Sequence, residues 1–220
     1  DFMKQYCSPW EDMIFYVGRI VREKGIQVLI QAMPEILREN PSTKLVIAGK
    51  GGFVDDLKRQ ANYLDISDRI YFTGFISDEV RNKLYQAADV AVFPSLYEPF
   101  GIVALEAMCT ETPLIVSDVG GMSEFVEHKK TGLKVEANNP YLLAHSVKQV
   151  LNNKKESKKM AERAYKMVNE KFTWDKIAAQ TNKIYEEILE EYDESNWNKK
   201  LENTYINEEE ERLAGSFKYE

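Results

Sequence analysis

Residues 94–106 place two carboxylates around the expected start of a helix. The segment Pro94-Ser-Leu-Tyr-Glu98-Pro-Phe-Gly101 leads into an apolar run over residues 101–109, which predicts a helix with Glu106 about a turn and a half inside it. The N-terminus of a helix offers unpaired backbone N–H groups and about half a positive charge, which suits a phosphate. Carboxylates accept hydrogen bonds from hydroxyl groups. Glu106 therefore suits a ribose diol, and Glu98 suits the hydroxyls of a sugar.

A second segment, residues 18–25, supplies cations. Between two glycines it carries Arg19, Arg22 and Lys24. An arginine can bind two phosphate oxygens at once, whereas a lysine acts as a point charge. The segment therefore suits an anion, although a solvated surface loop is an equally ordinary use for these residue types. This loop alone leaves both interpretations open.

Alternating apolar segments must position these residues. Short continuous apolar runs predict strands, and the stretches between them have helical spacing. The expected strands are residues 13–17, 45–48, 70–73, 90–93, 113–117 and 133–135. This pattern predicts an α/β fold, a doubly wound parallel sheet of the Rossmann type covered on both faces. Ligands of such sheets bind at the carboxyl ends of the strands. We therefore expect the chemistry in the loops at residues 18–25, 49–53, 74–77, 94–101 and 118–123.

Local signals refine the expected helices. Ser77 is placed to cap a helix over residues 77–87. Pro34 should kink the helix expected at residues 26–40 or mark a late start. Gly120 and Gly121 predict a turn, with a short helix starting near Ser123. Further helices are expected at residues 141–152, 157–170 and 174–191.

Charge divides the chain unevenly. The 220 residues carry 29 Lys and Arg against 36 Asp and Glu, a net charge of −7, which argues against a nucleic-acid-binding protein. Residues 186–220 hold 12 acidic and 4 basic residues. The preceding part therefore holds 24 acidic and 25 basic residues and is nearly neutral. We expect a ligand-binding domain at residues 1–172, a C-terminal helix at 173–192 and an acidic tail at 193–220.

The rarer residues exclude other classes of protein. Two cysteines and two histidines are too few for a disulfide scaffold or a Cys/His metal centre. Cys109 is expected to be a buried apolar residue, His128 a surface loop residue and His145 a structural one. No apolar run approaches the ~20 residues that span a bilayer, and no signal peptide is present. The sequence therefore predicts a cytoplasmic protein, and the start at Asp1 suggests a piece of a longer chain.

The segment Glu98-Pro-Phe-Gly-Ile-Val-Ala-Leu-Glu106-Ala resembles the Glu-x7-Glu motif of retaining GT-B glycosyltransferases, most closely family 4 and more distantly glycogen and sucrose synthases. Other landmarks follow in the order of that family over residues 11–190. They are Gly18-Arg19 with Lys24-Gly25, Gly49-Lys-Gly51, Phe72-Thr-Gly74-Phe-Ile76, Leu84-Tyr85 with Asp89, residues 113–121 with Glu124, Thr131-Gly132-Leu133, and Phe172-Thr-Trp174 with Tyr185. The aromatic residues of the last group are expected to pack rather than to bind sugar.

The resemblance implies a role for each candidate residue. Arg19 and Lys24, in the loop that begins at Gly18, would hold the diphosphate of a nucleotide sugar, helped by the backbone N–H groups of Phe100, Gly101 and Ile102. Glu106 would bind the ribose, Glu98 the hydroxyls of the transferred sugar, and the backbone around Ile76 the base. Fixed cations and a helix dipole would stabilise the departing diphosphate without a metal. The expected catalytic residues are thus Arg19, Lys24 and Glu98, with no cofactor beyond the nucleotide sugar, and a nucleophilic role for Glu98 is the weaker interpretation.

The family also implies a missing half. A GT-B enzyme has two Rossmann-like domains, and this chain would supply the donor-binding one for a hexosyl transfer. The acceptor would bind to an N-terminal domain, to which the helix at residues 174–191 would cross back. Without that domain, we expect an exposed apolar patch on this helix, possible homodimers of the fragment, and little transfer activity.

Three positions depart from the family pattern. Glu111 stands where the family has glycine and is expected to strain its turn, Lys130 replaces another frequent glycine, and Asn139-Pro140 replaces an Asp-Pro that opens a helix. None of them touches the candidate phosphate site. Two other functions stay open: a nucleotide-sugar epimerase of the same architecture, and a non-catalytic scaffold that binds partners through the acidic tail.

Overall fold

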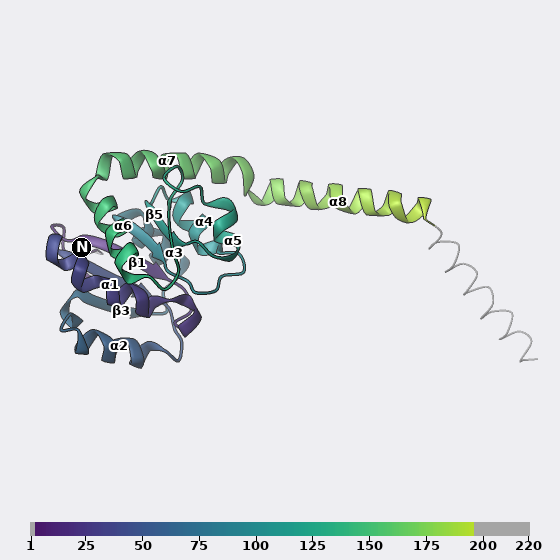
Figure 1. Ribbon diagram of the computed structural model, residues 1–220. Coiled ribbons are helices and arrows are strands. Elements are labelled where there is room, and N and C mark those ends of the chain that lie inside the picture. Colours follow the sequence, from purple (N-terminus) through teal and green to yellow (C-terminus); the bar gives the residue numbers. More distant parts are fainter. Residues whose placement is uncertain (1–2, 196–220) are drawn as a thin grey trace, which may run out of the picture. The chain divides into compact units, whose positions relative to one another are not determined.

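The computed structural model describes residues 3–195 (Figure 1). The chain forms two compact units, residues 1–170 and 171–220. Within the second unit, the described part consists of residues 171–195. The finer division expected at residues 172 and 192 stays a prediction, and most of the expected acidic tail lies outside the described residues.

A six-stranded parallel sheet forms the centre of the first unit. Its strands are β1 (Asp12–Val17), β2 (Thr43–Ala48), β3 (Ile70–Gly74), β4 (Val90–Phe93), β5 (Leu114–Ser117) and β6 (Leu133–Val135). They lie in the order β3-β2-β1-β4-β5-β6, with every neighbouring pair parallel. The predicted doubly wound, Rossmann-like fold is confirmed. The direction of winding reverses between β1 and β4, which is the switch point where ligands bind in such sheets.

Helices cover both faces of this sheet (Figure 1). They are α1 (Ile26–Glu39), α2 (Val54–Tyr63), α3 (Asp78–Ala87), α4 (Ile102–Cys109), α5 (Gly120–Phe125), α6 (Pro140–Asn152) and α7 (Lys154–Lys171). Single turns of 3-10 helix occur at η1 (Met3–Gln5), η2 (Arg22–Lys24) and η3 (Ser67–Arg69). The helices α1 and α6 pack on each other, while α3 and α4 meet through Tyr85 and Val103. Right-handed crossovers in the two winding directions place α3 and α4 on the face opposite to α1.

The core explains why the strands read as continuous apolar runs. Every residue of β4 and β5 is buried, and so are Met13 to Tyr16 of β1. Leu29, Ile30 and Met33 of α1 are fully buried against the sheet. Each buried side chain of this size contributes about 1.5–3 kcal/mol relative to exposure. A strand that is covered on both faces needs no polar alternation.

The capping residues act as expected. Ser77 Oγ accepts a hydrogen bond from the N–H of Val80 at 3.3 Å, and Asn139 Oδ1 accepts one from Leu142 at 3.1 Å. The late start expected at Pro34 is wrong, because α1 begins at Ile26 and contains the proline. The helix expected near Ser123 begins earlier, at Gly120, whose carbonyl accepts a hydrogen bond from the Ser123 hydroxyl.

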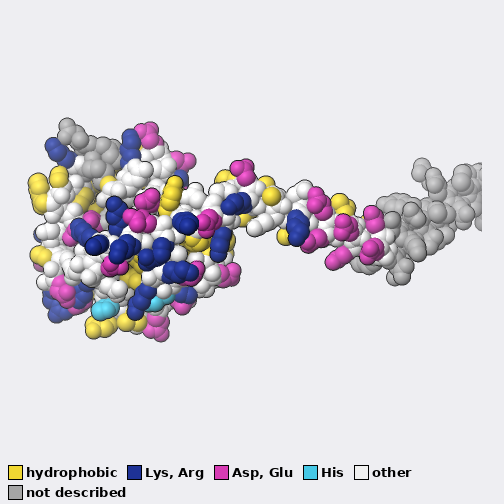
Figure 2. Space-filling model, turned by 90° about the horizontal axis from the view of Figure 1, so that it is seen from above, with side chains coloured by type: hydrophobic (Ala, Val, Ile, Leu, Met, Phe, Trp, Pro, Cys, Tyr) yellow, Lys and Arg dark blue, Asp and Glu magenta, His cyan; other side chains and the backbone are white. Residues whose placement is uncertain are grey.

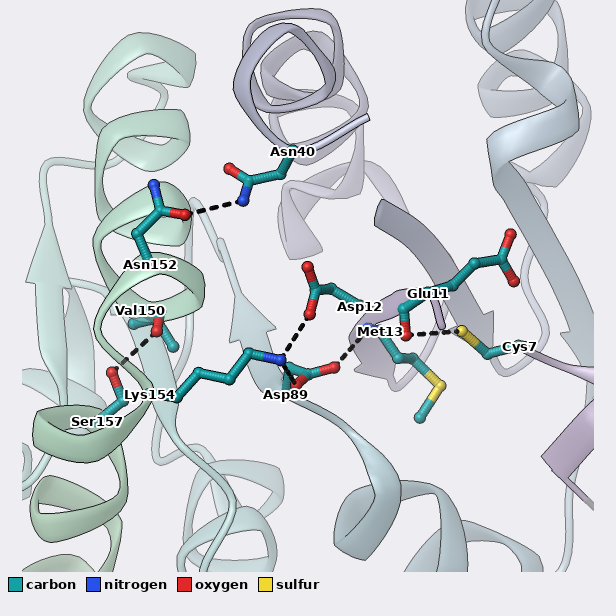
Figure 3. A network of polar contacts seen from close by, with 10 residues as sticks. All are labelled: Cys7, Glu11, Asp12, Met13, Asn40, Asp89, Val150, Asn152, Lys154 and Ser157. Atoms are coloured by element: carbon teal, nitrogen blue, oxygen red, sulfur yellow. Dashed lines mark hydrogen bonds and ion pairs between the residues drawn. The ribbon is translucent and has the colours of Figure 1, made fainter. Parts of the chain in front are cut away.

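A polar network joins α7 to the starting ends of β1 and β4 (Figure 3). Lys154 Nζ donates to Asp12 at 2.7 Å and to Asp89 at 2.9 Å. The other oxygen of Asp89 accepts from the backbone N–H of Met13 at 2.8 Å. These hydrogen bonds raise the pKa of Lys154 above its ordinary value. The network fixes the amino-terminal edge of the sheet, opposite to the edge where a ligand is expected.

Several single-residue expectations can be compared with this fold. Both cysteines are free, but Cys109 is exposed and not buried as expected. The reason is that α4 buries Ala104, Ala107 and Met108, and Cys109 lies outside that face of the helix. His128 is exposed as expected, and its Nδ1 accepts from the N–H of Lys134. His145 is exposed on α6.

The second unit contains α8 (Trp174–Glu194), in which every residue is at least partly exposed. Its large apolar residues recur at helical spacing and are exposed, namely Trp174, Ile184, Tyr185, Ile188 and Leu189. The exposed apolar patch expected on this helix is therefore present, whereas Trp174 and Tyr185 do not pack as expected. Carboxylates gather toward the C-terminal end of α8, while the first unit shows Lys and Arg interspersed with acidic residues (Figure 2). None of the helices between residues 3 and 195 is long and apolar enough to cross a membrane.

Replacing Glu111 by glycine should stabilise the chain. Glu111 follows α4 and has φ 54°, a left-handed conformation that favours glycine and costs other residues about 1–2 kcal/mol. Part of this gain is offset by the greater freedom of glycine in the unfolded chain. We expect Glu111→Gly to raise the free energy of unfolding by about 0.5–1 kcal/mol in urea titrations. Glu111→Ala keeps the strain, so equal stability of the two variants would contradict this account.

Candidate functional site

The loops after β1 and β4 are joined through their backbones at the switch point. The carbonyl of Glu23 accepts hydrogen bonds from the N–H of Leu96 at 2.8 Å and of Tyr97 at 3.2 Å. Gly25 has φ 69°, and a Cβ at this position would lie 1.8 Å from the carbonyl oxygen of Pro94. Only glycine permits so close an approach of the two chains. The join therefore fixes the cationic loop against the loop that carries Glu98.

A cavity of about 350 Å³ opens beside this join. It contains six of the nine residues that the sequence singled out, namely Gly18, Arg19, Lys24, Glu98, Gly101 and Ile102. The other residues of its lining are Tyr16, Val17, Phe93, Ser95 and Val103. The fold thus brings candidate residues of both loops to one cavity. The roles given to the residues stay predictions.

Lys24 and Glu98 form an ion pair within the cavity. Lys24 Nζ lies 2.7 Å from Glu98 Oε2, and the side chains are 16% and 9% exposed. The hydroxyl of Ser95 donates to the same oxygen at 3.2 Å. Within the described residues, the other oxygen, Oε1, accepts no hydrogen bond. The family resemblance implies separate roles for these two residues, and the fold makes them partners.

Tyr16 and Arg19 form the wall near the end of β1. The ring of Tyr16 is fully buried, and its hydroxyl donates to the carbonyl of Arg19 at 3.1 Å. Burial raises the pKa of Tyr16, so this hydroxyl stays protonated and keeps its donor. The side chain of Arg19 is 73% exposed and lies 3.9 Å from Glu23. An exposed guanidinium at the rim of the cavity is free to rotate toward an incoming anion.

The N-terminus of α4 also borders the cavity. Gly101 has φ 96°, and a Cβ there would lie 2.4 Å from Met122 Cγ, so the turn into the helix requires glycine. Within the described residues, the backbone N–H groups of Phe100, Gly101 and Ile102 donate no hydrogen bond. Unpaired N–H groups at a helix start attract an anion.

Glu106 lies apart from the lining of the cavity, between α4 and α3. Its Oε1 lies 3.4 Å from Arg81 Nη1, and its Oε2 lies 3.4 Å from the hydroxyl of Tyr85. Burial raises the pKa of Glu106 above the ordinary value, while the positive charge of Arg81 lowers it. The side chain is 26% exposed, so a ligand can still reach it.

Two other predicted residues also lie outside the cavity lining. Ile76 is partly exposed in the loop between β3 and α3. Phe100 is exposed, with its ring 5.8 Å from that of Phe125. The prediction for both concerned their backbones, so the position of the side chains does not test it.

The predictions from the sequence did not include four side chains that shape this region. Tyr16 and Ser95 line the cavity, and Arg81 and Tyr85 contact Glu106. Ser95 and Tyr85 lay inside quoted motifs, but their partners are distant in sequence and left no local signal. Within residues 3–195, no group of three or more His, Cys, Asp and Glu side chains is arranged to hold a metal ion.

The fold and the site define a Rossmann-like domain with a cavity at its switch point that is lined by Arg19, Lys24 and Glu98. A family model described as "Glycosyl transferases group 1" matches residues 8–167. The chain belongs to this family.

Similar proteins agree with this assignment. An uncharacterized glycosyltransferase of Methanocaldococcus jannaschii is 44% identical over 180 residues, which cover 82% of this chain and 46% of that protein. A sucrose-phosphate synthase structure from Thermosynechococcus elongatus is 32% identical with a TM-score of 0.78, covering 86% of this chain and 48% of that one. An Anabaena protein solved in complex with UDP-glucose is 24% identical with a TM-score of 0.75. The match covers 81% of this chain and 49% of that one and shows a shared fold. The chain thus spans about half the length of the relatives it matches, and its first unit has the Rossmann-like fold of a GT-B glycosyltransferase.

The ion pair between Lys24 and Glu98 should be strongly coupled. Lys24→Met leaves a nearly buried carboxylate without its partner and should destabilise the chain by about 2–4 kcal/mol. The double variant Lys24→Met/Glu98→Gln should be destabilised by at least about 1 kcal/mol less than the sum of its single variants, as measured by urea unfolding. The exposed pair Lys83 and Glu79 serves as the control, with a coupling below about 0.5 kcal/mol. Additive effects at Lys24 and Glu98 would contradict the pairing.

Glu106→Gln should stabilise the chain more at pH 7 than at pH 4. Because burial raises the pKa of Glu106 in the folded chain, its contribution to stability is present at acid pH and is lost as the pH rises through that raised pKa. Glutamine has no such loss. The control is Glu79→Gln, because the hydrogen bond from Lys83 lowers the pKa of Glu79, so its stabilisation is lost toward acid pH instead. Urea unfolding at both pH values measures the two opposite trends.

Proposed function

We propose that this chain is the donor-binding half of a retaining family 4 glycosyltransferase. The whole enzyme would move a hexosyl group from a nucleotide-diphosphate sugar to an acceptor held by an N-terminal domain. The observation that carries the proposal is the Lys24–Glu98 pair in a cavity bordered by the open N-terminus of α4. The similar Anabaena protein solved with UDP-glucose supports a nucleotide sugar as the ligand.

The diphosphate would lie between three sources of positive charge. They are Lys24, the exposed guanidinium of Arg19 at the rim, and the unpaired N–H groups of residues 100–102. Negative charge grows on the diphosphate as the bond to the sugar breaks, and donors fixed in advance stabilise that charge with little reorganisation. In this proposal the chain's own residues supply the stabilisation, without a metal or a cofactor beyond the nucleotide sugar.

Glu98 would bind the sugar through one oxygen. Its Oε2 is held by Lys24 and Ser95, which leaves Oε1 to accept from a sugar hydroxyl. Two donors on one oxygen keep the carboxylate in a single orientation and reduce its reactivity. A positioning role therefore suits Glu98 better than a nucleophilic one.

The nucleoside would extend from the cavity toward α3. Glu106 would accept hydrogen bonds from the ribose hydroxyls, and the backbone at Ile76 would meet the base. Both residues lie outside the cavity lining. This position fits the proposal, because the nucleoside would extend beyond the diphosphate in the cavity.

Transfer itself would need the other half of the enzyme. The chain spans about half the length of its relatives, so it should bind donor and transfer little. Helix α8 would cross to that half and pack on it through its exposed apolar residues. Without that half, the same residues would pack two copies of the chain against each other. A cytoplasmic location stays a prediction from the sequence.

Calorimetric titration with UDP, GDP, ADP and inorganic pyrophosphate tests this function. One nucleotide should bind. Lys24→Ala should lower the affinity for that nucleotide and for pyrophosphate by about 5- to 150-fold, which corresponds to about 1–3 kcal/mol. Glu106→Ala should weaken binding of the nucleotide but not of pyrophosphate. The control is Lys159→Ala on α7, which should weaken binding of neither ligand.

A failure of the chain to bind any of these ligands at millimolar concentration leads to the same titration on the longer protein. No binding there either would overturn the donor-site proposal and favour a scaffold. Loss of nucleotide binding in Glu106→Ala together with loss of pyrophosphate binding would contradict the division of roles.

A further inference from the structure

Arg81 is the main charged partner of Glu106. It lies on α3, and its Nη1 contacts Glu106 Oε1 at 3.4 Å and Asp78 Oδ1 at 3.0 Å. The Arg81 and Glu106 side chains are 25% and 26% exposed, whereas Asp78 is almost fully exposed. Attraction across the shielded contact is screened less by water than attraction to the exposed one. Arg81 therefore donates a hydrogen bond to Asp78 and attracts Glu106 across the more shielded contact.

Tyr85 contributes less to Glu106 than its position suggests. Its hydroxyl has one hydrogen and two acceptors within reach, the carbonyl of Val103 at 3.0 Å and Glu106 Oε2 at 3.4 Å. The shorter bond takes the hydrogen for most of the time. Glu106 thus depends on Arg81 both for its negative charge and for its orientation.

The remaining groups around Glu106 do not replace this cation. Asp78 adds negative charge, Tyr85 is buried and protonated because burial raises its pKa, and Cys109 on α4 is a thiol whose pKa is also raised. Among the groups that act on the carboxylate, Arg81 is the cation. Its Nε is buried and has no hydrogen-bond partner within residues 3–195, so no described residue anchors the guanidinium through that atom.

We propose that Arg81 is a positioning residue that keeps Glu106 ionised and oriented, and that it thereby sets a preference for ribonucleotides over 2′-deoxyribonucleotides. The proposal rests on the proposed function, in which Glu106 accepts hydrogen bonds from the ribose. Among the described residues, each carboxylate oxygen of Glu106 has one polar neighbour, which leaves a lone pair on each oxygen for one of two adjacent hydroxyls. A nucleotide without the 2′-hydroxyl leaves one of them unused.

The first test needs no ligand. Selective 13C labelling of glutamate carboxyls, with Glu106→Gln to assign the resonance, follows the titration of Glu106 by NMR. Arg81→Gln should raise the pKa of Glu106, and Arg81→Lys should restore most of the original value by returning the charge. The control is Arg59→Gln, which removes an arginine from a comparable i, i+3 pair with Asp56 on α2 and should change nothing. An unchanged titration in Arg81→Gln would overturn the proposal even if nucleotides bind.

The second test compares UDP with 2′-deoxy-UDP, or the corresponding pair for whichever base binds best, together with pyrophosphate. Wild type should prefer the ribonucleotide by about 10-fold or more, the effect of a hydrogen bond to a charged group. Arg81→Gln should reduce this ratio to less than about 3-fold and leave pyrophosphate binding intact, and Tyr85→Phe should change the ratio less.

The outcomes separate the two proposals. Absence of binding by the wild-type chain and also by the longer protein rejects the donor site and, with it, the ribose preference. Binding of pyrophosphate and nucleotide without a ribose preference retains the anion site and rejects the inference about Arg81. A ratio that is equally high in wild type and Arg81→Gln also rejects it.

Discussion

The paired hydrogen bonds from Leu96 and Tyr97 to the carbonyl of Glu23 are the constraint on which the site depends. They tie two loops that are separated by more than 70 residues, at the one place in the sheet where the strand order reverses. Backbone contacts of this kind tolerate no side chain between the chains, which is why Gly25 stands at the join. Once the loops are fixed, Lys24, Glu98 and the start of α4 border the same cavity.

The site contains two pairs of a cation with a carboxylate, and both are shielded from water. Lys24 with Glu98 lies inside the cavity, and Arg81 with Glu106 lies beside it. Shielded ion pairs contribute little to stability because desolvation offsets their attraction. Their presence is better explained by orientation, because each pair holds one carboxylate in place while leaving acceptors free. The raised pKa of Glu106 marks the energetic cost of keeping such a group charged.

The two compact units differ in how they use apolar residues. The first unit buries them between helices and a parallel sheet, and its amino-terminal edge is closed by Lys154 with Asp12 and Asp89. The second unit displays them along α8, opposite a row of carboxylates. A helix with one apolar and one charged face is typical of a segment that packs against a partner. This contrast and the half-length coverage of the relatives support the proposal that a second domain packs on α8.

The sequence alone determined the elements of this protein and the loops that carry its chemistry. Continuous apolar runs specified the six strands, and Ser77 and Asn139 specified helix starts, because each of these depends on neighbours in the chain. The left-handed turn at Glu111 was implied by the family pattern, which has glycine there. The tertiary structure decided the pairing of Lys24 with Glu98, the partnership of Arg81 with Glu106 and the exposure of Cys109. The two pairings depend on contacts between residues 74 and 25 positions apart. The exposure of Cys109 depends on which side of the largely apolar α4 faces the core. Local patterns carry no record of either.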